Sequence, residues 1–116
     1  MEFTDSLKKN YEFRRLYNKG KSAATPYVVV YVKRTGRDTN RLGVTVSNKI
    51  GKAVVRNKVR RRLREIYRLH EGEMQRGVDL VFVARGRSVD ATSAQLEQAV
   101  IKACKQLKVV KEQSET

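Results

Sequence analysis

Residues 41–68 read RLGVTVSNKIGKAVVRNKVRRRLREIYR, and they contain two periodic patterns joined by a short loop. Over residues 41–47 every second side chain is apolar, which predicts a strand with one apolar face. Over residues 53–69 apolar side chains recur on one arc of about 120°, which predicts an amphipathic helix. The apolar face of the strand consists of Leu42, Val44 and Val46, and that of the helix of Val55, Val59, Leu63, Ile66 and Tyr67. We therefore expect a strand, a loop and a helix whose apolar side packs on a sheet.

The segments around this unit predict further elements. The apolar run at residues 78–84 indicates a strand covered on both faces, and the alternation over residues 27–33 indicates another strand. Residues 10–19 have helical spacing, and Thr92 and Gln95 fit a capping box that opens a last helix. The resulting order is α-β-β-α-β-α, which predicts an α+β sandwich with helices packed against a small sheet.

Length and composition limit the class of protein. The chain has 116 residues and a net charge of +14, so we expect one domain spanning residues 1–116, with an N-terminal arm at 1–8 and a flexible, fraying tail at 109–116. It has no apolar run near the roughly 18–20 residues of a membrane helix, and no signal-peptide pattern in MEFTDSLKKN. One cysteine and one histidine argue against a disulfide framework and a zinc finger. We expect a cytoplasmic protein that binds a polyanion, with no membrane partner.

The positive charge is concentrated in residues 49–68, which hold nine Lys and Arg but only one acid, Glu65. Each arginine offers a planar fork that matches phosphate oxygens. Like charges stack at Arg56, Arg60 and Arg64 on the predicted helix, whereas a solvated face usually mixes signs. This pattern favours a nucleic-acid backbone over the two alternatives, an anionic membrane surface and a merely solvated face.

Aromatic residues suggest a second feature of the same site. Two of them share a helical face and two share a strand face, beside a strand face of small residues. Such a groove suits the stacking of unpaired bases, and core filling is the alternative; the pattern leaves both open. The aromatic residues are Phe13, Tyr17, Tyr27 and Tyr31, and the small residues are Gly43, Thr45 and Ser47.

The sequence offers no catalytic machinery that we can identify. It contains no phosphate-binding glycine loop, no paired His ligands and no pair of carboxylates with a plausible base. Cys104 lies on the apolar side of the last predicted helix, and His70 falls near the end of the basic helix. We therefore predict no catalytic residues and no metal site in the protein itself.

Several blocks of this sequence resemble one known family. Residues 41–65, with the run Gly51-Lys-Ala-Val-Val-Arg-Asn57 inside them, closely resemble the signature of the bacterial ribonuclease P protein subunit. Upstream residues around Phe13 and Tyr17 and the downstream block at 79–85 resemble its flanking segments. The resemblance extends over about residues 6–108.

The resemblance implies a fold and a function. The family folds like one domain of a small-subunit ribosomal protein, with a left-handed β-α-β crossover through the basic helix, against the usual right-handed rule. Its members join a catalytic RNA that removes the 5′ leader of precursor tRNA. The RNA and substrate hold most of the Mg²⁺, and the protein binds the single-stranded leader in a central cleft. We therefore expect the catalytic RNA and precursor tRNA as partners, and no DNA.

Two groups of RNA-binding residues follow from the patterns and the resemblance together. For the leader cleft they are Phe13, Tyr17, Tyr27, Tyr31, Thr45 and Ser47. For the basic loop and helix they are Lys49, Lys52, Arg56, Asn57, Lys58, Arg60, Arg61, Arg64 and Arg68. Lys58 and Asn48 depart from the residues common in the family, so neither is expected to be a decisive contact. The alternatives are a ribosomal protein that binds structured ribosomal RNA, and an adaptor for membranes or acidic proteins.

Overall fold

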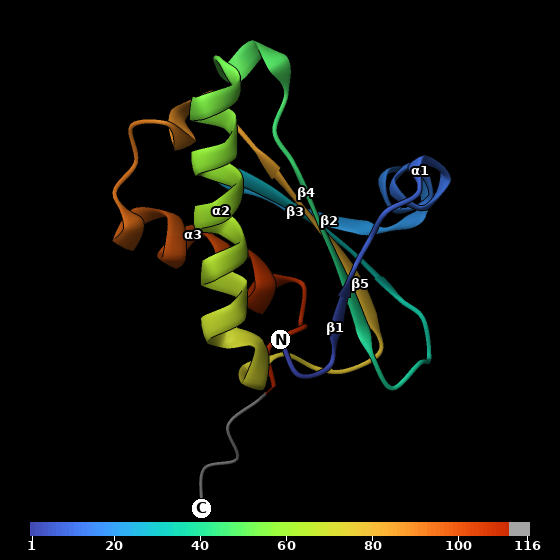
Figure 1. The fold of residues 1–116 in the computed structure, drawn as a ribbon. Helices are drawn as coiled ribbons and strands as arrows, with labels where there is room; N and C mark the ends of the chain where they lie inside the picture. The colour runs from blue at the N-terminus through green and yellow to red at the C-terminus, as the bar shows by residue number, and fades with distance from the viewer. Residues whose placement is uncertain (112–116) are drawn as a thin grey trace, which may run out of the picture.

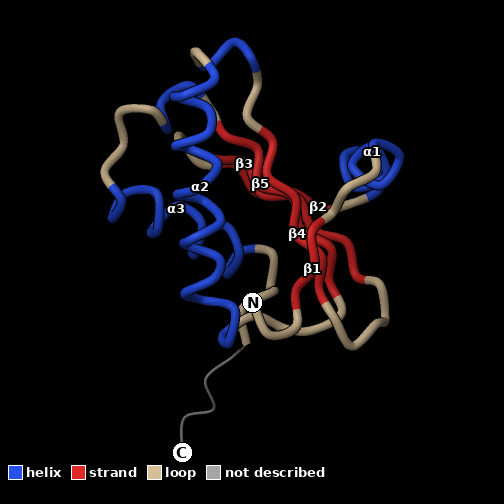
Figure 2. Tube along the Cα trace, in the orientation of Figure 1, coloured by secondary structure: helices blue, strands red, loops and turns tan. Residues whose placement is uncertain are grey.

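The protein is a five-stranded sheet with helices on both faces (Figures 1 and 2). This computed structural model describes residues 1–111. The strands are β1 (Thr4–Ser6), β2 (Lys21–Ala24), β3 (Val28–Arg34), β4 (Asn40–Thr45) and β5 (Val78–Ala84), in the sheet order β1-β4-β5-β3-β2. The helices are α1 (Asn10–Lys19), α2 (Ala53–His70) and α3 (Ser93–Gln106), with short 3-10 helices η1 (Asn48–Ile50), η2 (Glu71–Glu73) and η3 (Gly86–Ser88). The predicted α+β class is confirmed.

The helices form two layers around the sheet. Figure 1 shows α2 and α3 on one face and α1 on the other. β4 and β5 are parallel neighbours, and the chain passes from one to the other through α2. This is the β-α-β connection that the resemblance implies; its left-handed sense stays a prediction. No helix in the described part of the chain is long and apolar enough to cross a membrane.

The main core lies between the sheet and the pair α2 and α3. Val28, Val30 and Val32 of β3 turn to this side and are at most 5% exposed. The ring of Tyr67 on α2 meets that of Phe82 on β5 edge to face, with 6.2 Å between centroids. The predicted apolar faces of the strand and helix are confirmed: Leu42, Val44, Val46, Val59, Leu63, Ile66 and Tyr67 are buried, and Val55 is half-buried.

The N-terminal segment differs from the expected arm. β1 pairs in parallel with the start of β4, and Leu7 is buried. The carboxylate of Glu71 accepts hydrogen bonds from the backbone N–H groups of Glu2 and Phe3, at 2.7 and 3.2 Å. Burial acts to raise the pKa of Glu71, but hydrogen bonds from Thr4 and these two amides leave it below the ordinary value. A three-residue strand has too few alternations to be recognised from sequence, so β1 was absent from the predicted order.

Two other corrections concern β2 and the tail. β2 pairs antiparallel with β3, so the observed order is β-α-β-β-β-α-β-α. The tail prediction is wrong for its first residues: Val109 is 1% exposed, and its carbonyl accepts a 2.7 Å hydrogen bond from the Gln75 amide. Residues 112–116 lie outside the described part of the chain.

A buried polar network joins β1, β4 and α2, and it gives a first testable prediction. The hydroxyl of Tyr67 shares a 2.8 Å hydrogen bond with Thr4 Oγ1 and accepts another from Asn40 Nδ2 at 3.2 Å. Tyr67→Phe is expected to lower the free energy of unfolding by about 1 kcal/mol, because Asn40 keeps its bond to the Gln75 carbonyl. Urea unfolding measures this change. A loss near zero would mean that the network does not stabilise the docked strand.

His70, the last residue of α2, connects the two helices on one face. Its Nδ1 lies 2.5 Å from Glu73 Oε2 and its Nε2 lies 3.0 Å from Glu97 Oε2 of α3. The hydrogen bond with Glu97 raises the pKa of His70; partial burial opposes the shift, and Glu73 adds to it. The stabilisation is therefore complete below the unfolded-state pKa of about 6.5 and is lost as pH rises through the folded-state value.

His70→Gln should accordingly lower the melting temperature more at about pH 5.5 than at about pH 8.5. The charged imidazolium that both glutamates favour is present only on the acidic side. Thermal unfolding at constant ionic strength measures the difference. Equal destabilisation at both pH values would show that His70 contributes only packing.

Candidate nucleic-acid interface

Helix α1 is held on the sheet by an ion-pair cluster. Arg41 of β4 donates to both carboxylate oxygens of Asp79 on β5, at 3.0 and 2.7 Å, and it also pairs with Glu12 of α1. The hydrogen bond to Asp79 raises the pKa of Arg41 against partial burial, so the guanidinium stays charged. Leu16 of α1 is buried in a second, smaller core against Val81. These contacts fix which face of α1 remains accessible.

The close approach of α1 depends on Gly43 of β4. A Cβ atom at this position would lie 2.5 Å from Cε1 of Phe13, far inside van der Waals contact. The ring of Phe13 therefore lies directly over the glycine, and Phe13 is half-buried. The small residue that predicted a hollow is in fact covered by the aromatic ring. Phe13 therefore packs against the second core and is also partly accessible at the predicted cleft.

Two tyrosines extend this aromatic surface toward solvent. The rings of Tyr17 on α1 and Tyr31 on β3 pack edge to face with 5.0 Å between centroids. The hydroxyl of Tyr17 shares a 3.0 Å hydrogen bond with Thr45 Oγ1 at the end of β4. Tyr17 is 37% exposed and Tyr31 is half-buried. The structure thus brings four predicted cleft residues together, and we call Phe13, Tyr17, Tyr31 and Thr45 the aromatic surface.

Tyr27 does not belong to this surface, so the prediction that it shares a strand face with Tyr31 beside the leader cleft is wrong. The regular strand β3 begins only at Val28, and the period-two alternation cannot be extended back past that point. Tyr27 packs instead against the main core on the side of α2 and α3. The guanidinium of Arg87 lies 5.6 Å from the centroid of its ring.

The loop before α2 is built by its own polar side chains. Ser47 is exposed and accepts a 3.2 Å hydrogen bond from the Lys49 amide, which starts η1. Arg56 donates from Nε to the Gly51 carbonyl at 3.2 Å and from Nη1 to Asn48 Oδ1 at 2.7 Å. Arg56 thus ties the loop to α2. Asn48, which was not expected to be a decisive contact because it lacks a charge, has a structural role that no sequence pattern signals.

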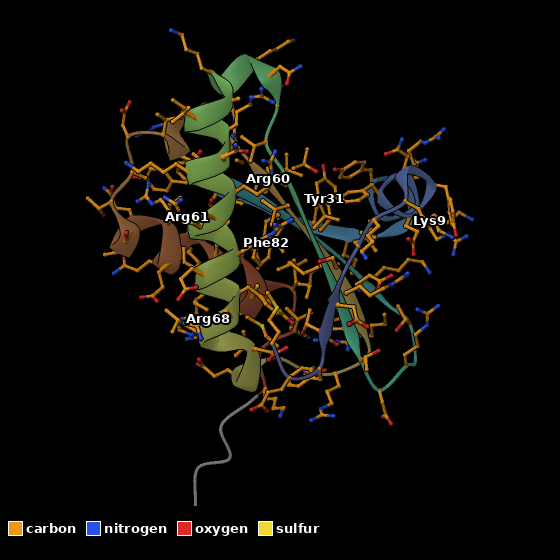
Figure 3. The ribbon with its side chains drawn as sticks, viewed as in Figure 1. Lys9, Tyr31, Arg60, Arg61, Arg68 and Phe82 are labelled. Atoms are coloured by element: carbon orange, nitrogen blue, oxygen red, sulfur yellow. The ribbon has the colours of Figure 1, made fainter. Side chains whose placement is uncertain are left out.

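Four more arginines form a face along α2, while Arg62 instead donates to the Ala91 carbonyl at 2.8 Å. Figure 3 shows Arg60 and Arg61 near the middle of α2 and Arg68 toward its C-terminal end. They border a shallow hollow of about 470 Å³, which Met1 also lines. We call this surface the α2 arginine face, and its members are Asn57, Arg60, Arg61, Arg64 and Arg68. Lys49, Lys52 and Lys58 are exposed around the start of the helix.

Within the arginine face the side chains are not equally available. Arg68 pairs with Glu65 at 2.5 Å, with both side chains about half exposed, and the pair raises the pKa of Arg68 and lowers that of Glu65. Such an exposed pair is worth little and can be exchanged for a phosphate. Arg60 donates to Asn57 Oδ1 at 2.7 Å. The contribution of Met1 was missed, because only the docking of β1 brings the N-terminus to this helix.

The one cysteine thiol is not accessible for chemistry at the surface. Cys104 is fully buried, and this burial raises the pKa of its thiol to about 12. Among residues 1–111 there is no group of three His, Cys, Asp or Glu side chains arranged to hold a metal ion. What the surface offers is a row of arginine forks for phosphates and, on the α1 side of the sheet, aromatic rings for bases.

Known proteins similar to this chain agree closely in sequence and fold. Residues 1–108 match the family described as Ribonuclease P. The ribonuclease P protein component of Alkaliphilus oremlandii is 39% identical over 110 residues, covering 95% of this chain and 96% of that protein. That of Clostridium botulinum is 48% identical over 98 residues, covering 84% and 88%. The structure of the Staphylococcus aureus RNase P protein superposes with a TM-score of 0.83 at 36% identity, covering 91% of this chain and 97% of that one.

Proposed function

The chain belongs to the ribonuclease P protein family, which takes part in tRNA processing, and from this we propose that it binds the catalytic RNA and the single-stranded 5′ leader of precursor tRNA. In this role it is a non-catalytic subunit that assists Mg²⁺-dependent removal of the leader to leave a mature 5′ end. The proposed site of action is the cytoplasm, where precursor tRNA is made in bacteria. The alternative of a ribosomal protein is set aside, because the match to the ribonuclease P family covers residues 1–108.

The observation that carries the proposal is the α2 arginine face. Arg60, Arg61 and Arg64 present three guanidinium groups around one hollow, with Glu65 as the one acid lining it. A row of like charges in isolation destabilises a helix, and a polyanion relieves the repulsion. Because phosphate contacts position RNA without reading its sequence, this face suits the backbone of a large structured RNA.

The aromatic surface supports the second part of the proposal. The rings of Tyr17 and Tyr31 pack edge to face, Tyr17 is exposed and Tyr31 is half-buried, and Thr45 is a hydrogen-bonding group beside them. Stacking of a base on an aromatic ring contributes about 1–3 kcal/mol and tolerates every base. A subunit that serves many precursor tRNAs needs this tolerance. The leader is therefore proposed to lie across Tyr17 and Tyr31, with Ser47 and Lys49 at its phosphates.

Mg²⁺ is proposed to be held by the RNA partner and the substrate. The donor sets of residues 1–111 do not provide a metal cluster, so no step is assigned to a metal on the protein. When bound to the RNA, Mg²⁺ supplies charge neutralisation and an activated water at the scissile phosphate. The protein's own contribution is to neutralise phosphates with Arg60, Arg61 and Arg64 and to hold the leader extended.

Reconstitution tests this proposal. The catalytic RNA is assayed on a precursor tRNA at low Mg²⁺, with and without the full chain, and mature tRNA serves as a binding control. We expect cleavage to rise steeply when the chain is added and the chain alone to cleave nothing. With about six phosphates engaged, leader binding should fall with salt at a log–log slope near −4. Cleavage by an RNA-free preparation, or a slope near zero, would contradict the proposal.

A further inference from the structure

A second cationic surface is lined by residues outside α2's arginine face. A hollow of about 870 Å³ opens between the end of β3, the segment after α2 and the end of α3. Four cations line it: Arg34, Lys105, Lys108 and Lys111. Glu73 is the one carboxylate among its lining residues, and its Oε2 lies 2.5 Å from His70 Nδ1. We call this surface the C-terminal hollow.

Several hydrogen bonds hold the backbone segments that line the C-terminal hollow. Arg34 donates to Gln75 Oε1 at 3.0 Å and to the Lys108 carbonyl at 3.3 Å. The Lys111 amide donates to the Glu73 carbonyl at 2.8 Å, and Lys108 itself has a left-handed φ of 62°. The turn that ends α3 is thus fixed against β3 and η2. Three lysines are held around one concavity, and within residues 1–111 none of them forms an ion pair.

The lining of the hollow shares no residue with the α2 arginine face, although Arg68 of that face lies only four residues before Gly72. The hollow lies just past the C-terminal end of α2, whereas the basic loop at 47–52 precedes its N-terminal end. A helix of 18 residues is about 27 Å long, so the hollow and that loop lie at opposite ends of that length. The aromatic surface is on the other face of the sheet (Figure 1). A leader strand bound there does not reach the hollow along the same path.

We propose that the C-terminal hollow binds phosphates of the catalytic RNA, as a contact separate from that of α2's arginine face. This inference rests on the proposed function. The chemistry favours RNA over an acidic peptide, because peptide interfaces depend on buried apolar anchors and Val110 is the one large apolar side chain lining the hollow. Phosphate contacts require only cations and a concave backbone. Of the two RNA partners, the catalytic RNA is the candidate, because the leader of precursor tRNA is proposed to lie across Tyr17 and Tyr31 on the other face of the sheet.

The test uses the full chain, since the segment after Lys111 adds two glutamates. Lys105→Glu and Lys111→Glu are made singly and together, and binding to the catalytic RNA and to a leader-length single strand is titrated at several salt concentrations. Lys102→Glu is the matched control, because it lies on the same helix, is equally exposed and does not line the hollow. The Arg61→Gln/Arg64→Gln variant reports on α2. Circular dichroism melting confirms that each variant is folded.

For the double lysine variant we expect at least a tenfold loss of affinity for the catalytic RNA at 0.1 M salt and a salt slope about 1.5 smaller, with leader binding unchanged. Lys102→Glu should lose less than threefold. If the double variant behaves like this control while the α2 variant loses affinity, the hollow is not an RNA site and the proposed function stands. If the α2 variant keeps full affinity for the catalytic RNA, the proposed function fails, whatever the hollow does.

Discussion

Replacing Arg60, Arg61 and Arg64 together with glutamine is expected to weaken binding of the catalytic RNA by about 100-fold at 0.1 M salt. Each guanidinium that leaves a phosphate gives up the release of condensed counterions, and three such losses also reduce the salt slope by about 2. The three side chains lie on the α2 arginine face, and the fold does not depend on them for core contacts. Filter binding or fluorescence anisotropy over a salt series measures both effects.

The control variant loses the same number of positive charges, but from residues outside α2. Arg37, Arg87 and Lys102 are exposed residues outside α2, and their triple glutamine variant should lose less than about fivefold at the same salt. Arg56 is left unchanged in both proteins, because its side chain holds the loop through Gly51 and Asn48. Equal losses in the two triple variants would mean that binding follows net charge and not the arginine face.

Tyr17→Ala is expected to weaken binding of precursor tRNA to the holoenzyme by about 1–3 kcal/mol, with mature tRNA almost unaffected. The side chain is exposed at the edge of the aromatic surface, so its removal deletes a stacking platform for the leader and little core packing. Parallel titrations with precursor and mature tRNA give the difference directly. Shortening the leader should abolish the effect of the substitution, since only leader nucleotides meet this ring.

Two variants make the result specific. Tyr17→Phe keeps the ring and loses only the hydrogen bond to Thr45, so precursor binding should stay within a few-fold of the parent. Tyr11→Ala removes an exposed ring from the same helix outside the aromatic surface and should change nothing. An equal loss of precursor and mature tRNA binding by Tyr17→Ala would assign Tyr17 to the support of the fold and not to the leader.

Long periodic elements were predictable because periodicity reports burial directly. The strand at 78–84 has the predicted boundaries, and α2 differs from its predicted range by one residue, ending at His70. The capping box at Thr92 is present, with the Gln95 amide donating to Thr92 Oγ1 at 3.1 Å. The capping box depends on contacts within one turn of helix, and the strand and α2 depend on the apolar pattern of their own side chains. Local sequence is sufficient to specify them.

The short and edge elements were not predictable from local pattern. β1 and β2 have three and four residues, too few for a period-two pattern to identify a strand. β1 is stabilised by pairing with β4, which is distant in sequence, and β2 by pairing with the adjacent strand β3. The prediction that Tyr27 shares a strand face with Tyr31 was wrong for another reason. The position at which β3 begins is set by its pairing with β5 and not by its own alternation. Arg56 was predicted as an RNA contact, and its partner Asn48 becomes visible only when the loop is folded.

By itself, the amino-acid sequence determined the α+β class, the apolar side of each long element, the concentration of arginine on one helix and the resemblance to a family, since all of these are carried by residues close together in the chain. Only the tertiary structure decided that Phe13 covers Gly43, that Tyr27 leaves the aromatic surface, that Met1 reaches α2 and that lysines at and after the end of α3 meet Arg34 around a second hollow. The physical reason is that these contacts join segments separated by tens of residues. Their free energy depends on how the sheet pairs and twists, which no short window of sequence contains.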